Sequence, residues 1–77
     1  MPIAFVCITT EPASMVEVLE SLKAVEGVEE AQMVYGIYDI VVKVKGDSIN
    51  SLKKIITENI RTISKVTTAI TMIVVKA

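Results

Sequence analysis

Apolar residues along this chain follow two different spacings, and the spacing changes several times from one end to the other. Residues 3–10 form a short run rich in β-branched and aromatic types, which is typical of a buried strand. Residues 66–75 form a similar run, and so do residues 38–45, whereas residues 28–35 alternate loosely between apolar and polar types. The sequence therefore predicts four strands, the middle two forming a hairpin about Gly36.

Two of the stretches between these strands have the spacing of amphipathic helices. The first begins at Ser14, because Ser14 and Glu17 have the spacing of a capping box, and Gly27 is its predicted stop. The second follows a turn and cap at residues 46–48. The two apolar stripes consist of Met15, Val18, Leu19, Leu22 and Val25 in the first helix, and of Ile49, Leu52, Ile55, Ile56, Ile60 and Ile63 in the second.

These elements follow one another in the order βαββαβ. Residues 22–31 align weakly with residues 60–69, as expected for two similar βαβ halves. Since strand–helix–strand crossovers are right-handed, both helices fall on the same face of one sheet. We therefore predict a single α+β, ferredoxin-like domain over residues 1–77, with a four-stranded antiparallel sheet and two helices on one face.

The predicted sheet is apolar on both faces. In the first strand the two alternating sets are Ile3, Phe5 and Cys7 on one side and Ala4, Val6 and Ile8 on the other. The helices cover one face only, and apolar area contributes about 25 cal/mol per Å² when it is buried. We therefore expect a homodimer in which two sheets pack face to face, with Lys43 and Lys45 marking an end of the sheet that stays open.

Composition narrows the class of protein. The chain of 77 residues is 52% hydrophobic, and its mean hydropathy is +0.59. No apolar run reaches the roughly 18 to 20 residues that span a bilayer, and the first residues lack the basic region of a secretory signal, so we expect no membrane partner and a cytoplasmic location. The formal net charge of −1, with both signs interspersed, disfavours direct binding to nucleic acid.

Groups for catalysis or metal binding are scarce. The chain has no histidine, no Gly-rich phosphate loop, and a single cysteine, Cys7, inside the first apolar run. Cys7 is therefore interpreted as a core thiol, and no zinc cluster or intrachain disulfide can form. The sequence predicts neither an enzyme nor a cofactor or metal site.

One segment has the residues of a binding loop. Gly36, Ile37 and Asp39 lie between the only two tyrosines, Tyr35 and Tyr38. A carboxylate at a turn can pair with an ammonium group, and backbone N–H groups beside a glycine can hold a carboxylate, so one loop could bind both ends of an amino acid's backbone. The same residues also fit an ordinary hairpin turn in which Asp39 only accepts hydrogen bonds from turn amides.

Two patterns occur together at spacings that fit the predicted elements. They are Gly36-Ile37-Tyr38-Asp39, followed by three apolar residues, and Ile60-Arg61-x-Ile63-x-x-Val66-x-x-x-x-Thr71-x-Ile73-Val74. With these patterns nearly the whole chain resembles the regulatory (RAM) domain of Lrp/AsnC transcription factors. The family's usual Pro-Gly before the last strand is Ser64-Lys65 here, and its N-terminal DNA-binding domain is missing, so the chain resembles a stand-alone RAM module.

The resemblance implies dimers formed by sheet packing, as in dimeric α+β barrels, and assembly of these dimers into octamers or decamers. It also implies that an amino-acid effector binds between dimers. Full-length Lrp/AsnC regulators are a further implied partner, through which the chain would act as a co-regulator of transcription. The implied ligand-binding residues are Tyr35, Gly36, Ile37, Tyr38, Asp39 and Thr71.

Two other functions fit the same residues. A small dimeric α+β barrel enzyme could use the cleft between sheet and helices, although the missing histidine counts against it. A structural oligomer without a ligand is the other, and in that case Asp39 is only a turn residue. We expect the effector-binding module.

Overall fold

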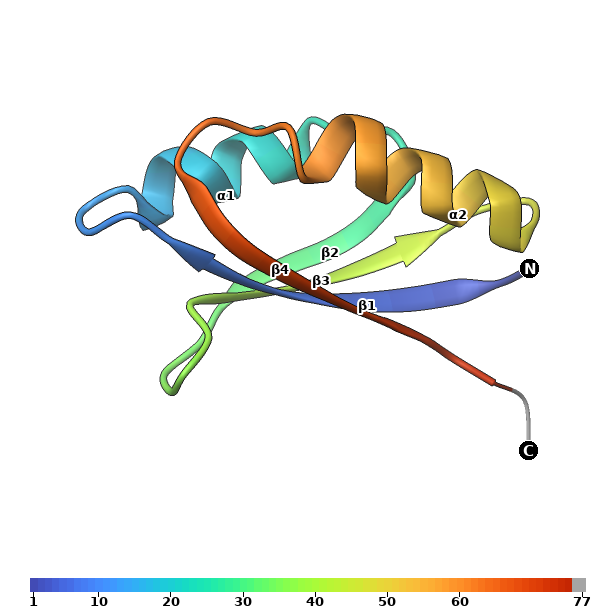
Figure 1. Ribbon diagram of the computed structural model, residues 1–77, viewed down its shortest axis with the longest axis horizontal. Helices are drawn as coiled ribbons and strands as arrows, with labels where there is room; N and C mark the ends of the chain where they lie inside the picture. The colour runs from blue at the N-terminus through green and yellow to red at the C-terminus, as the bar shows by residue number, and fades with distance from the viewer. Residues whose placement is uncertain (76–77) are drawn as a thin grey trace.

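The computed structural model describes residues 1–75, and its elements follow the predicted order (Figure 1). The strands are β1 (Ile3–Thr10), β2 (Val28–Met33), β3 (Ile40–Lys45) and β4 (Val66–Ile73). The helices are α1 (Met15–Lys23) and α2 (Ile49–Ile55), and α2 continues directly into a π-helical turn, η1 (Ile56–Ile60). The last two residues of the predicted domain, 76–77, lie outside the described residues.

The molecule has two layers, a sheet and a pair of helices. The four strands form one antiparallel sheet in the order β2-β3-β1-β4, so that β2 and β4 are its edges. Both helices lie on the same face of this sheet, and the opposite face is left uncovered (Figure 1). The predicted ferredoxin-like α+β fold of a single chain is thereby confirmed. Within residues 1–75, no helix is long and apolar enough to cross a membrane.

The core fills the space between the helices and the central strands. Val6 of β1 lies opposite Val42 of β3, and Ala4 lies opposite Val44, with all four side chains buried on the helix side. The predicted stripes supply the other layer, although Ile49, in the first turn of α2, is exposed. The buried hydrophobic residues are Ala4, Val6, Ile8, Val18, Leu19, Leu22, Ile40, Val42, Val44, Leu52, Ile56 and Ile60.

The start and the end of α1 differ from the prediction. Ser14 is the N-cap residue, but its side chain makes no capping hydrogen bond, and the carboxylate of Glu17 pairs with Lys65 at 3.1 Å instead of reaching back. The reason is the backbone of Ser14, whose φ of −110° and ψ of 4° lie outside the extended region that side-chain capping needs. The predicted capping box is therefore wrong. The helix also ends at Lys23, before the predicted stop at Gly27.

The second helix begins as predicted and ends in an unpredicted way. Ser48 is extended, with φ −149° and ψ 169°, and its hydroxyl oxygen accepts a hydrogen bond from the N–H of Ser51 at 3.1 Å. At the other end the N–H of Arg61 donates to the carbonyl of Ile56 at 2.9 Å, which closes a wider π-helical turn. The pair Ile56 and Ile60 faces the core in either kind of turn, so the apolar pattern does not distinguish them.

Gly27 lies in the turn between α1 and β2, where α2 and β3 come close to it. Its φ is +100°, a conformation that side chains disfavour, and a Cβ atom there would lie 2.8 Å from Cδ1 of Ile55 and 3.2 Å from the carbonyl oxygen of Lys45. The carbonyl of Gly27 also accepts the N–H of Lys45 at 2.8 Å. The turn therefore needs glycine for its backbone conformation and for its close packing.

We predict that Gly27→Ala lowers the free energy of unfolding by about 2 to 3 kcal/mol, because backbone strain and the contact with Ile55 add together. Gly36→Ala is the matched control, since Gly36 also has positive φ, +145°, but no heavy atom lies within 4 Å of its would-be Cβ. We expect a loss of about 1 kcal/mol there. Urea unfolding of both variants measures the difference, and equal losses would contradict the packing role of Gly27.

Candidate functional site

The loop that joins β2 to β3 contains five of the six predicted ligand-binding residues. In Figure 1 it extends past the sheet on the side away from the helices. Tyr35 and Ile37 are highly exposed, whereas Tyr38 and Asp39 are partly buried at the base. Gly36 at the tip has an uncovered backbone, with nothing within 4 Å of the position of a Cβ atom. The loop therefore presents hydrophobic side chains and accessible backbone to a ligand or to another chain.

Asp39 fastens this loop to the end of β1. Its Oδ2 accepts a hydrogen bond from the N–H of Thr10 at 2.9 Å, and its own N–H donates to the carbonyl of Ile8 at 2.9 Å. Its carbonyl accepts the N–H of Val34 at 2.9 Å, which closes the loop. The second carboxylate oxygen, Oδ1, makes no hydrogen bond within residues 1–75. One oxygen thus holds the loop, and the other can accept a hydrogen bond from an ammonium group.

Thr71, the sixth predicted residue, lies elsewhere. It is on the edge strand β4, opposite Val6, and both face the helix side of the sheet. Since the loop extends from the opposite side (Figure 1), the sheet separates Thr71 from Asp39 within one chain. A ligand contacting both residues would therefore need them from different copies.

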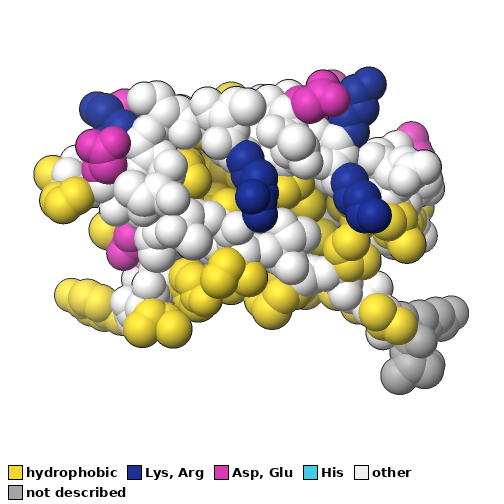
Figure 2. Space-filling view, in the orientation of Figure 1, with side chains coloured by type: hydrophobic (Ala, Val, Ile, Leu, Met, Phe, Trp, Pro, Cys, Tyr) yellow, Lys and Arg dark blue, Asp and Glu magenta, His cyan; other side chains and the backbone are white. Residues whose placement is uncertain are grey.

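Thr71 contributes to a groove between the second helix and the edge of the sheet, which we call the α2–β4 groove. Its volume is about 450 Å³. Figure 2 shows two basic side chains at the boundary between α2–η1 and β4. The groove is lined by Lys53, Ile56, Thr57, Arg61, Thr71 and Ile73. The sequence prediction missed Lys53, Thr57 and Arg61, although their spacing of four residues places them on one helix face.

The uncovered side of the sheet, the open face, is apolar on one half and polar on the other. Its apolar half lies on β1 and β4, where Phe5 is paired with Met72 and Cys7 with Ile70. Phe5, Ile70 and Met72 are 36%, 43% and 50% exposed. On the polar half Lys43 of β3 lies beside Glu30 of β2. Figure 2 shows hydrophobic side chains gathered along this side, and an exposed apolar patch of this kind is typical of an interaction surface.

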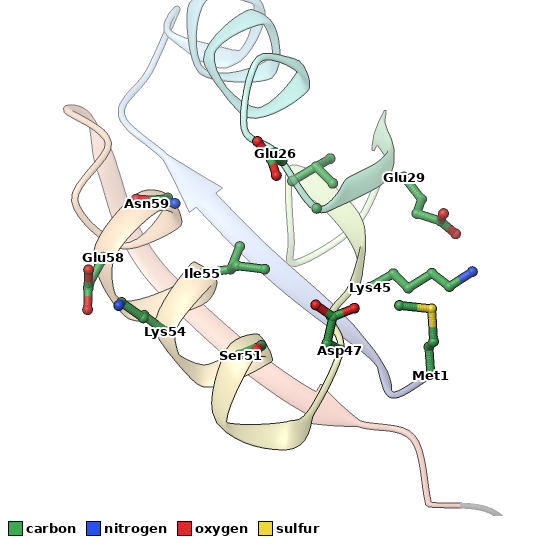
Figure 3. A pocket seen from close by; sticks show the side chains of 13 residues that line it. Met1, Glu26, Glu29, Lys45, Asp47, Ser51, Lys54, Ile55, Glu58 and Asn59 are labelled. Atoms are coloured by element: carbon green, nitrogen blue, oxygen red, sulfur yellow. The ribbon is translucent and has the colours of Figure 1, made fainter.

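A larger groove of about 700 Å³ runs between α2–η1, the turn that precedes β2 and the turn that follows β3. Ile55 lies between its walls, and both acidic and basic side chains surround it, among them Glu26, Lys54 and Glu58 (Figure 3). None of the predicted ligand-binding residues lies here. In the part of the chain that the structure describes, no three metal-ligating side chains come together, here or elsewhere.

Comparison with known proteins identifies the relatives of this fold. The family model of the Lrp/AsnC ligand binding domain matches residues 3–77. The crystal structure of FFRP-DM1 has a TM-score of 0.92 and 40% identity, over 97% of this chain and 100% of that chain. The hypothetical protein PHS023 from Pyrococcus horikoshii has a TM-score of 0.91 and 39% identity, over 100% of this chain and 93% of that one. Comparison with curated proteins gave no match.

A more distant structure is the transcriptional regulator NMB0573 from Neisseria meningitidis, solved as a complex with L-Met. It has a TM-score of 0.84 and 17% identity, over 97% of this chain and 50% of that chain. At this identity the similarity is one of fold alone. The present chain spans about half the length of that regulator.

We predict that Asp39→Ala lowers the free energy of unfolding by about 1 kcal/mol, because the N–H of Thr10 loses its acceptor. Asp39→Asn keeps an acceptor oxygen in the same place, so we expect its stability to stay close to that of the parent chain. Chemical denaturation of the two variants checks the difference. If Asn destabilised the chain as much as Ala, the hydrogen bond to Thr10 would not be what fastens the loop.

Proposed function

Because this chain belongs to the family of Lrp/AsnC ligand-binding domains, we propose that it binds an amino-acid effector and acts in the cytoplasm as a co-regulator of transcription. The family is one of regulatory domains, and its members are not enzymes, so the alternative of a small α+β barrel enzyme is dropped. The observation that carries the proposal is the loop of Asp39, which is held by one carboxylate oxygen, leaves the other without a hydrogen bond within residues 1–75, and includes the uncovered backbone of Gly36.

The proposed ligand contacts follow from the groups in this loop. Oδ1 of Asp39 accepts from the ammonium group of the amino acid, and backbone N–H groups near Gly36 hold its carboxylate. Tyr35, Ile37 and Tyr38 flank the side chain of the ligand. The L-Met complex of NMB0573 supports this class of ligand, because that regulator shares the fold of the present chain.

The remaining walls of the proposed site come from another copy. The loop is open to solvent in a single chain, and its exposed Tyr35 and Ile37 favour contact with a neighbouring chain. Thr71, which the sheet separates from the loop in its own chain, is the proposed hydroxyl contributed by that neighbour. The effector would then stabilise the assembly, because it binds only where two copies meet.

The proposed assembly begins with a dimer that buries the open face. Two copies related by a two-fold axis can cover the apolar half formed by Phe5, Ile70 and Met72. Lys43 and Glu30 then lie at the solvent-exposed rim of the interface. Dimers then associate through the loops into octamers or decamers. A full-length regulator with the same domain presents the same open face, which is how we propose that this chain joins mixed assemblies.

We predict that at least one of the twenty amino acids raises the melting temperature by about 5 to 10 °C when present at roughly ten times its Kd, because the ligand binds the native state only. Asp39→Asn should abolish this shift and leave the assembly intact. Asp47→Asn, at an acid outside the loop, is the matched control and should keep the shift. If none of the twenty shifts the transition of the parent chain, the structural-oligomer alternative is favoured.

We predict that Phe5→Lys weakens dimerisation at least about a hundredfold, because each copy would bury an unpaired ammonium group at the centre of the interface. Val16→Lys is the control, since Val16 is also an exposed hydrophobic residue but lies on α1, on the helix side. Light scattering across a concentration series gives the association state, and circular dichroism verifies folding. A Phe5→Lys variant that dimerises like the parent chain would exclude the open face as the interface.

A further inference from the structure

The α2–β4 groove collects several hydrogen-bond donors in one place. Lys53, Thr57 and Arg61 follow one another at intervals of four residues along α2 and η1, so their side chains lie on the same side of the helix. Thr71 lies opposite them on β4. Two cations and two hydroxyl groups therefore surround one groove of about 450 Å³.

The positive charge of this groove has no local counterpart. None of the six lining residues carries a carboxylate. The one ion pair formed within residues 1–75 joins Lys65 to Glu17, and neither of these residues lines the groove. An anion in the groove would meet complementary charge, and charge-assisted hydrogen bonds are the stronger kind.

The backbone of the edge strand adds a further donor. The N–H of Val74 donates to the carbonyl of Ile3 in β1, and backbone groups of successive strand residues point to alternate sides. Thr71, three residues earlier, therefore directs its N–H away from β1, toward the free edge. In agreement with this alternation, the outward carbonyl of Ala69 accepts from Nη2 of Arg61 at 2.8 Å. That bond holds the guanidinium of Arg61 at the edge, with its other N–H groups available.

The rest of the lining is apolar. Ile56 is buried under the groove, and Ile73 is a partly buried residue that packs against the core. A ligand that matches both parts has one anionic end and a short aliphatic chain. The volume suits a molecule of this size, since small-molecule sites start at about 300 Å³.

We propose that the α2–β4 groove binds a small aliphatic carboxylate, with Lys53 and Arg61 as its anion-binding residues and Thr71 as a further donor. This site goes beyond the proposed effector site, because it needs neither Asp39 nor an ammonium group on the ligand. The chain would then have a second ligand site, on the helix side of the sheet, for a ligand of a different chemical class.

Isothermal titration of the whole chain with 3-methylbutanoate tests the proposal, because this probe has a carboxylate and a branched aliphatic chain but no ammonium group. We expect binding to the parent chain and no binding of 3-methylbutanamide, its neutral counterpart. Lys53→Met should weaken binding about tenfold, the effect of one charge-assisted hydrogen bond, and Thr71→Val should weaken it several-fold. Lys54→Met, the neighbouring lysine outside this groove, is the control and should bind like the parent chain.

Several results would overturn the proposal. They are no binding of 3-methylbutanoate, equal binding of the amide, and equal affinity of the Lys53→Met variant and the parent chain.

Asp39→Asn separates the two sites, because we expect it to leave 3-methylbutanoate binding unchanged while it abolishes the amino-acid shift. If Asp39→Asn removed 3-methylbutanoate binding and Lys53→Met did not, the carboxylate would belong to the loop, and only the groove proposal would fail. If no amino acid bound but 3-methylbutanoate did, the groove would stand and the effector proposal would fail.

Discussion

The rest of this structure depends on one imbalance: two helices cover one face of the sheet, whereas the uncovered face is apolar over β1 and β4. The covered face forms the core through the buried side chains of β1 and β3. The open face leaves Phe5, Ile70 and Met72 between 36% and 50% exposed, so burying the rest of each side chain would contribute about 0.5 to 1.5 kcal/mol. Counted over two copies, this is a substantial share of the roughly 5 to 15 kcal/mol by which native proteins are stable. Association is therefore expected to be part of how the chain stays folded.

The two proposed ligand sites lie on opposite sides of this sheet. The loop with Gly36 and Asp39 extends on the side of the open face, so its surroundings depend on how copies meet (Figure 1). The α2–β4 groove lies on the helix side and is complete within one chain. The two proposed sites therefore differ, since the loop would bind its ligand only where copies meet and the groove would bind its ligand within one chain. Thr71 of β4 is a proposed contact in both.

Much of the fold could be predicted from the sequence, because the spacing of apolar residues within one segment shows whether that segment buries one face of a strand or of a helix. The bounds of β1 agree with the prediction, and so does the cap at Ser48. The capping box at Ser14 failed because its spacing says nothing about the backbone angles of the cap, and the π turn at Ile56 was missed because its apolar spacing equals that of an α-helix. Local pattern determines the elements, and tertiary contacts determine their ends.

The candidate site was less predictable for the same reason. Residues that are consecutive in the loop remain together, whereas Thr71 and Asp39 are separated by the sheet, and no local spacing reveals that. Lys53 and Arg61 lie outside the apolar stripe of the second helix, and only the position of β4 turns that part of the helix surface into a groove. Contacts between distant elements, and between copies, carry information that the pattern of one segment does not contain.

If the open face is buried between copies, the unmodified chain must associate, and sedimentation equilibrium tests this most directly. One chain has a mass of 8.4 kDa. At micromolar concentration we expect a mass of at least two chains, with no detectable single-chain species. A single species of 8.4 kDa that stays folded over the same range of concentration would contradict it.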